Sequence, residues 1–263
     1  MAANLPVSVP ADTVVVATLN IRNRADRWSE RSRLLLDQLD ELRPDVIGLQ
    51  ETRPPHWQAA WICREANRRL PPGEPRYTVV SARKTGLRRF WEGIAVMTRL
   101  PVLGTDTLDL RGGSRVAQRV GLALPDGTRL DFYNTHLHHA AEDDALRLNQ
   151  SRRIIEWMDA IGNLPRVLTG DFNSEPDSSA VRFITERLGS AYLDAHGVEP
   201  ELTSPTPLNR TDAAHLATID YIFISRQLVV HDAWLTFTAP DERDAHLYAS
   251  DHFGIAARVS VRR

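Results

Sequence analysis

Several short apolar runs in this chain each carry, at one end, a polar side chain suited to binding a metal or a phosphate. The clearest run, residues 165–169, is typical of a buried strand, and Gly170 breaks it just before Asp171 and Asn173. The other runs bring Asn20 after 14–19, Glu51 after 46–50, His136 after 130–135, and Asp251 and His252 before 253–257. Open α/β sheets bind ligands at the carboxyl ends of their strands. We therefore expect these side chains to form one site.

Short β runs alternate with amphipathic helical stretches, and we find no internal repeat, low-complexity tract or interdomain linker. Apolar residues at helical spacing predict a helix over residues 28–42 with Ser29 as its N-cap. Further helices are expected over 55–70, 142–161 and, capped by Asp177, 178–188. The expected strands cover 14–19, 46–50, 77–81, 93–98, three runs between 101 and 138, 165–169, 219–224, 228–237 and 253–261. This order predicts an α/β (α+β) fold in which two mixed sheets pack together under outer helices.

The 263 residues can bury roughly three quarters of their unfolded surface in one unit, so we expect a single domain over 1–263 with its core at about 13–260. The single cysteine, Cys63, excludes an intrachain disulfide and a cysteine-based zinc site, and its apolar surroundings favour a buried thiol. Residues 1–12 do not resemble a signal peptide, and no apolar run reaches the length of a membrane span. These features favour a cytoplasmic monomer without a membrane anchor or an obligate protein partner.

The formal net charge of −2 provides no overall positive field that would attract nucleic acid or acidic membranes. Two local basic clusters stand out: Arg22, Arg24, Arg27 and Arg31, and then Arg83, Lys84, Arg88 and Arg89. Such clusters are usually solvated faces, but they are also the best indication of a polyanionic substrate. Arg115 and Arg119 precede or enter an expected strand and are further candidates for the cleft.

A series of motifs gives the chain a family resemblance. They are Thr18–Arg22, Asp45–Glu51, Asn134–Leu137, Gly170–Ser174, Ile219–Phe223 and Ser250–His252. In this order they resemble the endonuclease/exonuclease/phosphatase superfamily, whose fold is like that of deoxyribonuclease I. The resemblance covers the chain from about residue 13 to 260. It implies a four-layer α-β-β-α sandwich and divalent-metal-dependent cleavage of phosphate esters.

The resemblance also implies a metal site. Glu51 is the first candidate ligand, with Asn20 and Asp251 nearby. Oxygen ligands without cysteine favour Mg²⁺ or Mn²⁺ over a structural zinc ion. A hard cation lowers the barrier to attack on an anionic phosphoester, and whether one or two ions bind is open. The simpler alternative for Glu51 is an acidic residue that precedes a helix.

The remaining residues match the family's catalytic groups. Asp171 resembles the aspartate that orients or deprotonates the attacking water, although Asp171 and Asn173 also suit a capping turn. Asp220 matches the carboxylate that holds His252 in one tautomer, and His252 acts either as a base or as an electrostatic stabiliser. His136 resembles a second active-site histidine, with Glu92 as its candidate carboxylate partner.

Substrate contacts are expected from Asn173, Arg22 and His138. Arg22 departs from the aspartate that apurinic endonucleases carry here, which weakens a repair-nuclease interpretation. His138 shares the face of His136 by strand alternation, or else lies at a solvated strand end.

The run 170–178, the segment Gly189–Tyr192 and the loop Thr203–Ala217 resemble the deadenylase and nocturnin-like branch. This resemblance implies a nuclease-like phosphodiesterase, with endo or exo cleavage open. A sphingomyelinase-like enzyme, a sugar or inositol phosphatase, and a noncatalytic scaffold are the alternatives. The complete set of acidic and imidazole residues argues against the scaffold.

Overall fold

The computed structural model describes residues 12–53, 55–86, 91–209, 211 and 215–263. Its first sheet consists of β1 (Val14–Asn20), β2 (Val46–Thr52), β3 (Thr78–Arg83), β4 (Gly93–Thr98), β11 (Leu228–Thr236) and β12 (Gly254–Val261). Its second sheet consists of β5 (Val102–Asp109), β6 (Val116–Ala123), β7 (Arg129–His136), β8 (Arg166–Asp171), β9 (Gly189–Ser190) and β10 (Asp220–Ile224). The strand orders are β11-β12-β1-β2-β4-β3 and β5-β6-β7-β8-β10-β9. Both sheets are mixed, because β1 with β2 and β7 with β8 are parallel pairs among antiparallel neighbours.

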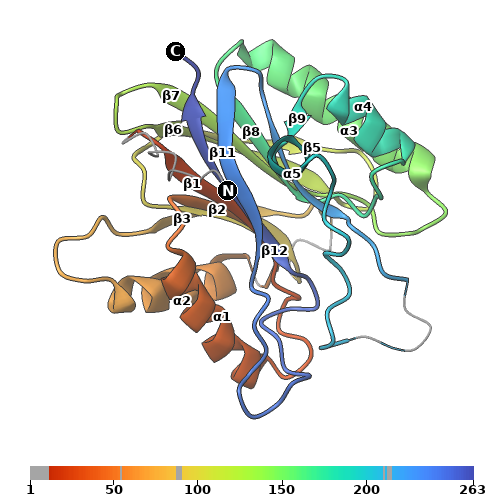
Figure 1. Cartoon of the computed structure of the whole chain (residues 1–263). Coiled ribbons are helices and arrows are strands. Elements are labelled where there is room, and N and C mark those ends of the chain that lie inside the picture. Colours follow the sequence, from red (N-terminus) through yellow and green to blue (C-terminus); the bar gives the residue numbers. More distant parts are fainter. Residues whose placement is uncertain (1–11, 54, 87–90, 210, 212–214) are drawn as a thin grey trace, which may run out of the picture.

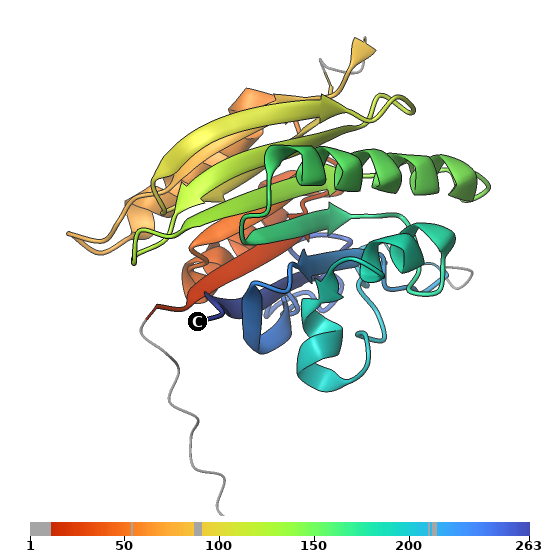
Figure 2. The same ribbon diagram turned by 90° about the horizontal axis from the view of Figure 1, so that it is seen from above.

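Helices cover the outer face of each sheet. The helices α1 (Trp28–Leu42) and α2 (Pro55–Arg69) lie against the first sheet, and α3 (Asp144–Ile161) and α4 (Ser179–Thr185) lie against the second (Figure 1). Seen from above, α3 runs along the strands of the second sheet (Figure 2). The arrangement confirms the predicted four-layer sandwich. In the part of the chain that the structure describes, no helix combines the length and apolarity needed to cross a bilayer.

Side-chain alternation along the strands supplies three large apolar clusters and a small fourth one of Ala82, Ile94 and Val116. Val14 and Val16 of β1 point between the sheets and share a cluster with Phe132 of β7. Ala17 and Leu19 point the other way, into the cluster beneath α1 and α2. A third cluster, between the second sheet and α3 and α4, contains Tyr133, Ile154, Leu168 and Phe172. The first sheet is therefore apolar on both faces, as expected for buried strands that read as continuous apolar runs.

The structure corrects the two predicted helix caps. Ser29 is not an N-cap: α1 begins at Trp28, and Arg27 holds the cap position in the left-handed conformation (φ 59°, ψ 36°). The cause is Arg31, whose buried guanidinium donates to backbone carbonyls of the preceding loop, among them those of Ala25 and Asp26, both at 2.6 Å. In the later helix Ser178, rather than Asp177, is the cap, because its hydroxyl accepts from the Val181 N–H at 3.2 Å.

Other boundaries differ modestly from the predictions. Helix α3 begins at Asp144 rather than at residue 142, and α4 ends at Thr185 rather than at residue 188. Strand β9 and the short helix α5 (Ala191–His196) were not predicted, because two and six residues are too short to show a period. Cys63 is buried, as predicted.

Candidate active site

Buried polar contacts join the two sheets beneath the site. Gly48 of β2 approaches the second sheet so closely that a Cβ atom would lie 2.6 Å from Thr169 Oγ1 and 2.8 Å from Asn134 Oδ1. The Asn134 amide donates to the Leu49 carbonyl at 3.1 Å and accepts from Gln50 Nε2 at 2.7 Å. A buried polar group that lost its partner would cost about 1–3 kcal/mol. These contacts therefore fix how the ends of β1, β2, β7 and β8 face one another.

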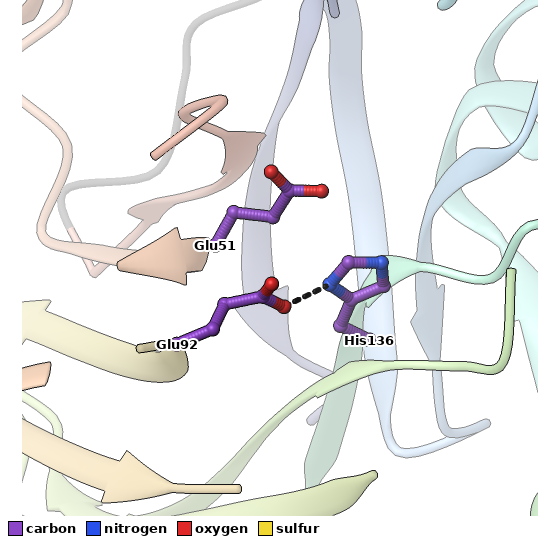
Figure 3. A group of neighbouring side chains, drawn as sticks. All are labelled: Glu51, Glu92 and His136. Atoms are coloured by element: carbon purple, nitrogen blue, oxygen red, sulfur yellow. Dashed lines mark ion pairs between the residues drawn. The ribbon is translucent and has the colours of Figure 1, made fainter. Parts of the chain in front are cut away.

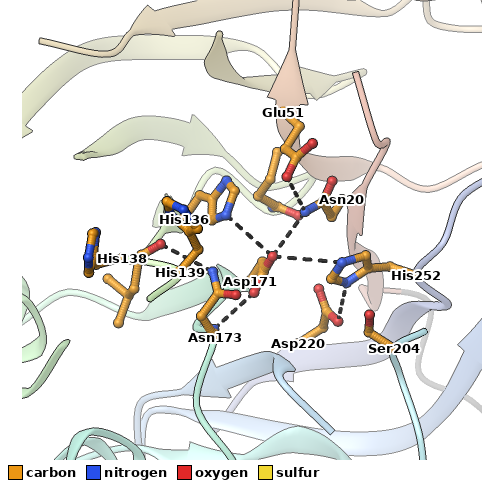
Figure 4. Close-up of polar contacts among 12 residues, drawn as sticks. Asn20, Glu51, His136, His138, His139, Asp171, Asn173, Ser204, Asp220 and His252 are labelled. Carbon is orange, nitrogen blue, oxygen red and sulfur yellow. Dashed lines mark hydrogen bonds and ion pairs between the residues drawn. The ribbon is translucent and has the colours of Figure 1, made fainter. Parts of the chain in front are cut away.

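Asp171, at the end of β8, is the centre of the site and is buried. Its Oδ2 accepts from Asn20 Nδ2 at 2.9 Å, and its Oδ1 accepts from the Asn173 N–H at 2.9 Å. The same Oδ2 lies 3.4 Å from His136 Nε2 and 3.9 Å from His252 Nε2 (Figure 4). One carboxylate oxygen thus faces two imidazole rings that come from different sheets.

The surroundings of Asp171 raise the pKa of its carboxyl group, so the protonated form is more stable here than it is in water. Burial, and next the charge of Asp220, raise the pKa of Asp171 to about 7. The charge of His252 and the hydrogen bonds from Asn20 and Asn173 act in the opposite direction but do not outweigh burial. A carboxylate with such a pKa can exchange a proton near neutral pH.

His252 is held by a buried carboxylate. Its Nδ1 lies 2.8 Å from Asp220 Oδ2, and Asp220 lies opposite Asp171 in the register of β10 and β8. Burial alone lowers the pKa of His252, but the charge and hydrogen bond of Asp220, together with Asp251 and Asp171, raise it well above its ordinary value. These carboxylates therefore favour the positively charged ring, which presents Nε2 toward Asp171.

His136 has the opposite character. Burial, followed by the positive charges of Arg115 and Lys84, lowers the pKa of His136 well below its ordinary value, so this ring is neutral. Its Nδ1 lies 3.7 Å from Glu92 Oε1 (Figure 3). Glu92 also pairs with Lys84 and, at 3.5 Å, with Arg115. The candidate partner of His136 is thus shared with two buried cations.

Glu51 reaches the site through an irregular strand end. The register of β2 against β4 shifts between Leu49 and Thr52, and Glu51 adopts φ 56°. Such a bulge re-aims a side chain beside a functional site. Burial, and then the charges of Glu92 and Asp251, raise the pKa of Glu51.

The donor set around Glu51 fits a hard divalent cation. Single ligand atoms of Glu51, Glu92 and His136 lie within 4.8 Å of one another. Among the described residues, Glu51 forms no ion pair, and its side-chain contact is with Asn20 Nδ2 at 3.3 Å. Among the described residues Glu92 and Asp251 have cationic partners but Glu51 has none, so a bound cation would relieve the repulsion that their charges exert on Glu51. Asp251 also acts on Glu51, but its Oδ2 pairs with Arg22 NH1 at 3.0 Å.

The sequence matches the family-wide pattern of the endonuclease/exonuclease/phosphatase family over residues 17–252. The chain belongs to this family. It is 28% identical to protein angel of Drosophila melanogaster over 178 residues, covering 62% of this chain and 48% of that protein. It is 24% identical to nocturnin of Xenopus laevis over 266 residues, covering 89% of this chain and 65% of that protein. It spans about half to two thirds of the length of these curated relatives.

The fold of the human nocturnin catalytic domain is similar to that of this chain, with a TM-score of 0.78 and 20% identity over 97% of this chain and 96% of that domain. These findings confirm the family that the sequence motifs indicated.

The structure brings almost all predicted site residues of this family member together. A cleft of about 420 Å³ is lined by Arg22, Glu51, Glu92, His136, Asp171, Asn173, Asp251 and His252. Asn20 and Asp220 lie beneath it, buried, where they hold Asp171 and His252. The catalytic, metal-binding and substrate-binding roles of these residues stay predictions.

His138 is the exception, because the structure does not place it in the cleft. Strand β7 ends at His136, so the alternation that would bring His138 to the same face does not continue. Its Nε2 instead lies 2.9 Å from Asp143 Oδ2, and its N–H donates to Gln150 Oε1 at 3.0 Å. His139 lines the cleft in its place.

Three polar residues that line the cleft were not among the predicted site residues, namely Lys84, His139 and Ser204. Lys84 carried a usable signal, because it is the only lysine of the chain and lies in a basic cluster. Of the two candidate arginines, Arg115 lines the cleft, whereas Arg119 pairs with Asp131 at 2.8 Å. The basic clusters are not a continuous surface, since Arg31 is fully buried. Arg88 and Arg89 lie outside the described residues.

Proposed function

We propose that this chain hydrolyses phosphodiester bonds of nucleic acid with the help of Mg²⁺ or Mn²⁺. The observation that carries the proposal is the buried carboxylate of Asp171 between a neutral His136 and a positively charged His252. Titratable groups whose environments push their pKa values apart mark acid–base sites. The similarity to nocturnin and protein angel supports the nuclease-like alternative among the phosphoesterases.

Asp171 acts on the attacking water. Water becomes a good nucleophile toward phosphorus when it gives up a proton, and a base with a pKa near the working pH accepts that proton most efficiently. Asn20 and the Asn173 N–H hold the carboxylate from two sides, so its orientation is fixed before substrate binds. Such pre-organisation saves the entropy of placing a catalytic group.

His252 and the nearby cations act on the phosphoryl oxygens. Negative charge spreads over these oxygens as the bond to the leaving oxygen breaks. The His252 imidazolium, fixed by Asp220, faces that charge and stabilises it. Arg22 and Asn173 line the same cleft and are placed to bind the substrate phosphate.

Glu51, with Asn20 and Asp251 as predicted from the sequence and Glu92 beside it, would hold the metal ion. A bound divalent cation supplies Lewis-acid polarisation of a phosphoryl oxygen. We also propose that the bound ion is Mg²⁺ or Mn²⁺. The protein is further proposed to be cytoplasmic and monomeric.

A side-by-side substrate test with Mg²⁺ or Mn²⁺ examines the proposal. Single-stranded DNA and RNA should be cleaved in preference to sphingomyelin and to sugar or inositol phosphates. Asp171→Ala and His252→Ala should each lower turnover by at least about a hundredfold, the scale of a lost acid–base or charge-stabilising group. His231→Ala is a matched control, because His231 bonds Ser260 outside the cleft. Full turnover in folded Asp171→Ala protein would refute the assigned role, and preference for sphingomyelin would replace the proposed substrate.

A further inference from the structure

A groove of about 560 Å³ lies beside the catalytic cleft, where the start of α1 meets the first turns of α2. Its principal walls are the side chains of Arg24, Trp28, Arg53, Trp57, Trp61 and Arg64. Three indole rings and three guanidinium groups thus share one depression, and none of its lining residues is acidic.

The tryptophans divide into a fixed pair and an exposed platform. Trp28 and Trp61 pack edge to face with ring centroids 5.9 Å apart, and both rest partly on the core beneath α1 and α2. Trp57 is different, because 76% of its surface is exposed, more than for any other large apolar residue that the structure describes. An indole ring left in water at the edge of a groove is suited to stack on a planar ligand.

The arginines of the groove provide uncompensated positive charge. Within the described residues, the guanidinium groups of Arg24 and Arg53 form neither an ion pair nor a hydrogen bond. Arg27, on the same loop as Arg24, is by contrast paired with two carboxylates. Among the described residues, the exposed Arg64 has one ion-pair partner, the half-buried Glu65 at 3.4 Å, which also pairs with Arg68 at 2.8 Å. This is a weak surface contact. The groove therefore selects for an anion that also carries an aromatic plane.

The groove is continuous with the catalytic cleft along the chain. Arg24 follows the cleft residue Arg22 by two positions, and Arg53 follows Glu51 by two, so each pair of Cα atoms is at most about 7 Å apart. Buried Gln58 ties the two loops together: its Nε2 donates to the Asn23 carbonyl at 2.8 Å, and its Oε1 accepts from the Arg53 N–H at 2.7 Å. The same two loops therefore supply lining residues to both the cleft and the groove, which are close neighbours.

We propose that this groove binds a nucleotide that neighbours the scissile phosphate of the substrate, with its base on Trp57 and its phosphate on Arg24 and Arg53. The inference rests on the proposed nuclease function. Base–indole stacking with backbone contacts from arginine binds single strands without reading their sequence. A paired base would have its faces covered by its neighbours, so the groove favours single-stranded over double-stranded substrate.

The test uses the full chain with EDTA, so that binding is measured without cleavage. The dissociation constants of a fluorescent single-stranded oligonucleotide and of a dinucleotide are compared for the unmodified chain and for Trp57→Ala, Trp57→Phe, Arg53→Ala and Arg68→Ala. We expect Trp57→Ala to weaken binding roughly tenfold, the scale of one lost stack, and Trp57→Phe to restore most of it. Arg53→Ala should make the dependence of log K on log salt shallower by about 0.7, as expected for one lost phosphate contact with a single strand. Arg68 lies one turn beyond Arg64 on α2 and outside the groove, so Arg68→Ala should leave both dissociation constants unchanged.

If Trp57→Ala and Arg53→Ala weaken binding of the oligonucleotide, the ligand of the groove is a nucleic-acid strand. If they weaken binding of the dinucleotide alone, the ligand is a small nucleotide. Unchanged binding of both probes to Trp57→Ala and Arg53→Ala overturns the inference. Turnover of a small chromogenic phosphodiester, which occupies only the cleft, should be the same in all these variants. Absence of that turnover from the unmodified chain would count against the proposed function, whereas binding to the groove is judged separately.

Discussion

Replacing Asp220 with asparagine tests whether a buried carboxylate keeps His252 catalytically competent. Asparagine retains the size of the side chain and an oxygen that can accept the hydrogen bond now made by His252 Nδ1 at 2.8 Å, but it removes the charge. Because Asp220 and His252 are 0% and 7% exposed, water cannot replace that charge. Charge-stabilising and acid–base groups contribute about 10²–10⁴-fold, and the burial of this pair leads us to expect a loss in kcat of about a thousandfold, or about 4 kcal/mol.

Steady-state kinetics on a chromogenic phosphodiester should show this loss in kcat with KM nearly constant, because the interaction strengthens as charge develops.

An NMR titration should show the pKa of His252 falling in Asp220→Asn. Because the pKa of His252 is raised in the folded chain, its protonation stabilises that chain fully at pH values below the pKa of unfolded histidine. This stability is lost as the pH rises through the pKa of His252 in the folded chain. The variant should therefore lose stability mainly at acidic pH. Asp143→Asn is the control, since it removes a carboxylate from His138, outside the cleft. Unchanged kcat despite a lowered His252 pKa would refute the role of the imidazolium.

Two more predictions concern the frame and the metal site. Gly170→Ala should lower the free energy of unfolding by about 2–4 kcal/mol in a urea titration, because a Cβ atom would lie 2.2 Å from the Thr135 carbonyl oxygen at φ 153°. Gly104→Ala, in open space on β5, should leave it nearly unchanged, and equal effects would contradict the steric argument. Mg²⁺ or Mn²⁺ at a hundred times its Kd should stabilise the unmodified chain by about 2.7 kcal/mol in thermal melts. In Glu51→Gln that gain should disappear, while the metal-free protein becomes more stable because carboxylate repulsion is relieved; an equal metal-induced shift would place the ion elsewhere.

The fold was largely predictable because each apolar run locates a strand, and the polar residue at its end locates part of the site. The run before Asn20 and the run before Glu51 are neighbouring parallel strands, and so are those before His136 and Asp171. Parallel neighbours bring their carboxyl ends to one edge, so locating the strands also located most of the cleft. The sequence predicted one shared site but not the contacts that hold the two edges against each other. One such contact joins Asn20 and Asp171, which are 151 residues apart.

The errors have local physical causes. Of the two placements considered for His138, the one in the cleft fails because alternation holds only while a strand continues, and β7 ends two residues earlier. Ser29 was misassigned as a cap because the buried guanidinium of Arg31, rather than a hydroxyl, organises the loop before α1. The pairing of Lys84 with Glu92 was not predicted, because it joins the ends of β3 and β4 at the site, which no local pattern reveals.

Asn20 shows why the site must act as one unit. Its Nδ2 donates both to Glu51, at 3.3 Å, and to Asp171, at 2.9 Å, and its Oδ1 accepts from the Arg22 N–H at 2.9 Å. The side-chain amide of Asn20 thus contacts the candidate metal ligand Glu51, the candidate base Asp171 and the backbone of Arg22, and it links the two sheets. Any slip of one sheet against the other would separate Asp171 from Asn20, Glu51 and Arg22. The polar contacts buried between the sheets are therefore as necessary to the chemistry as the residues that face the substrate.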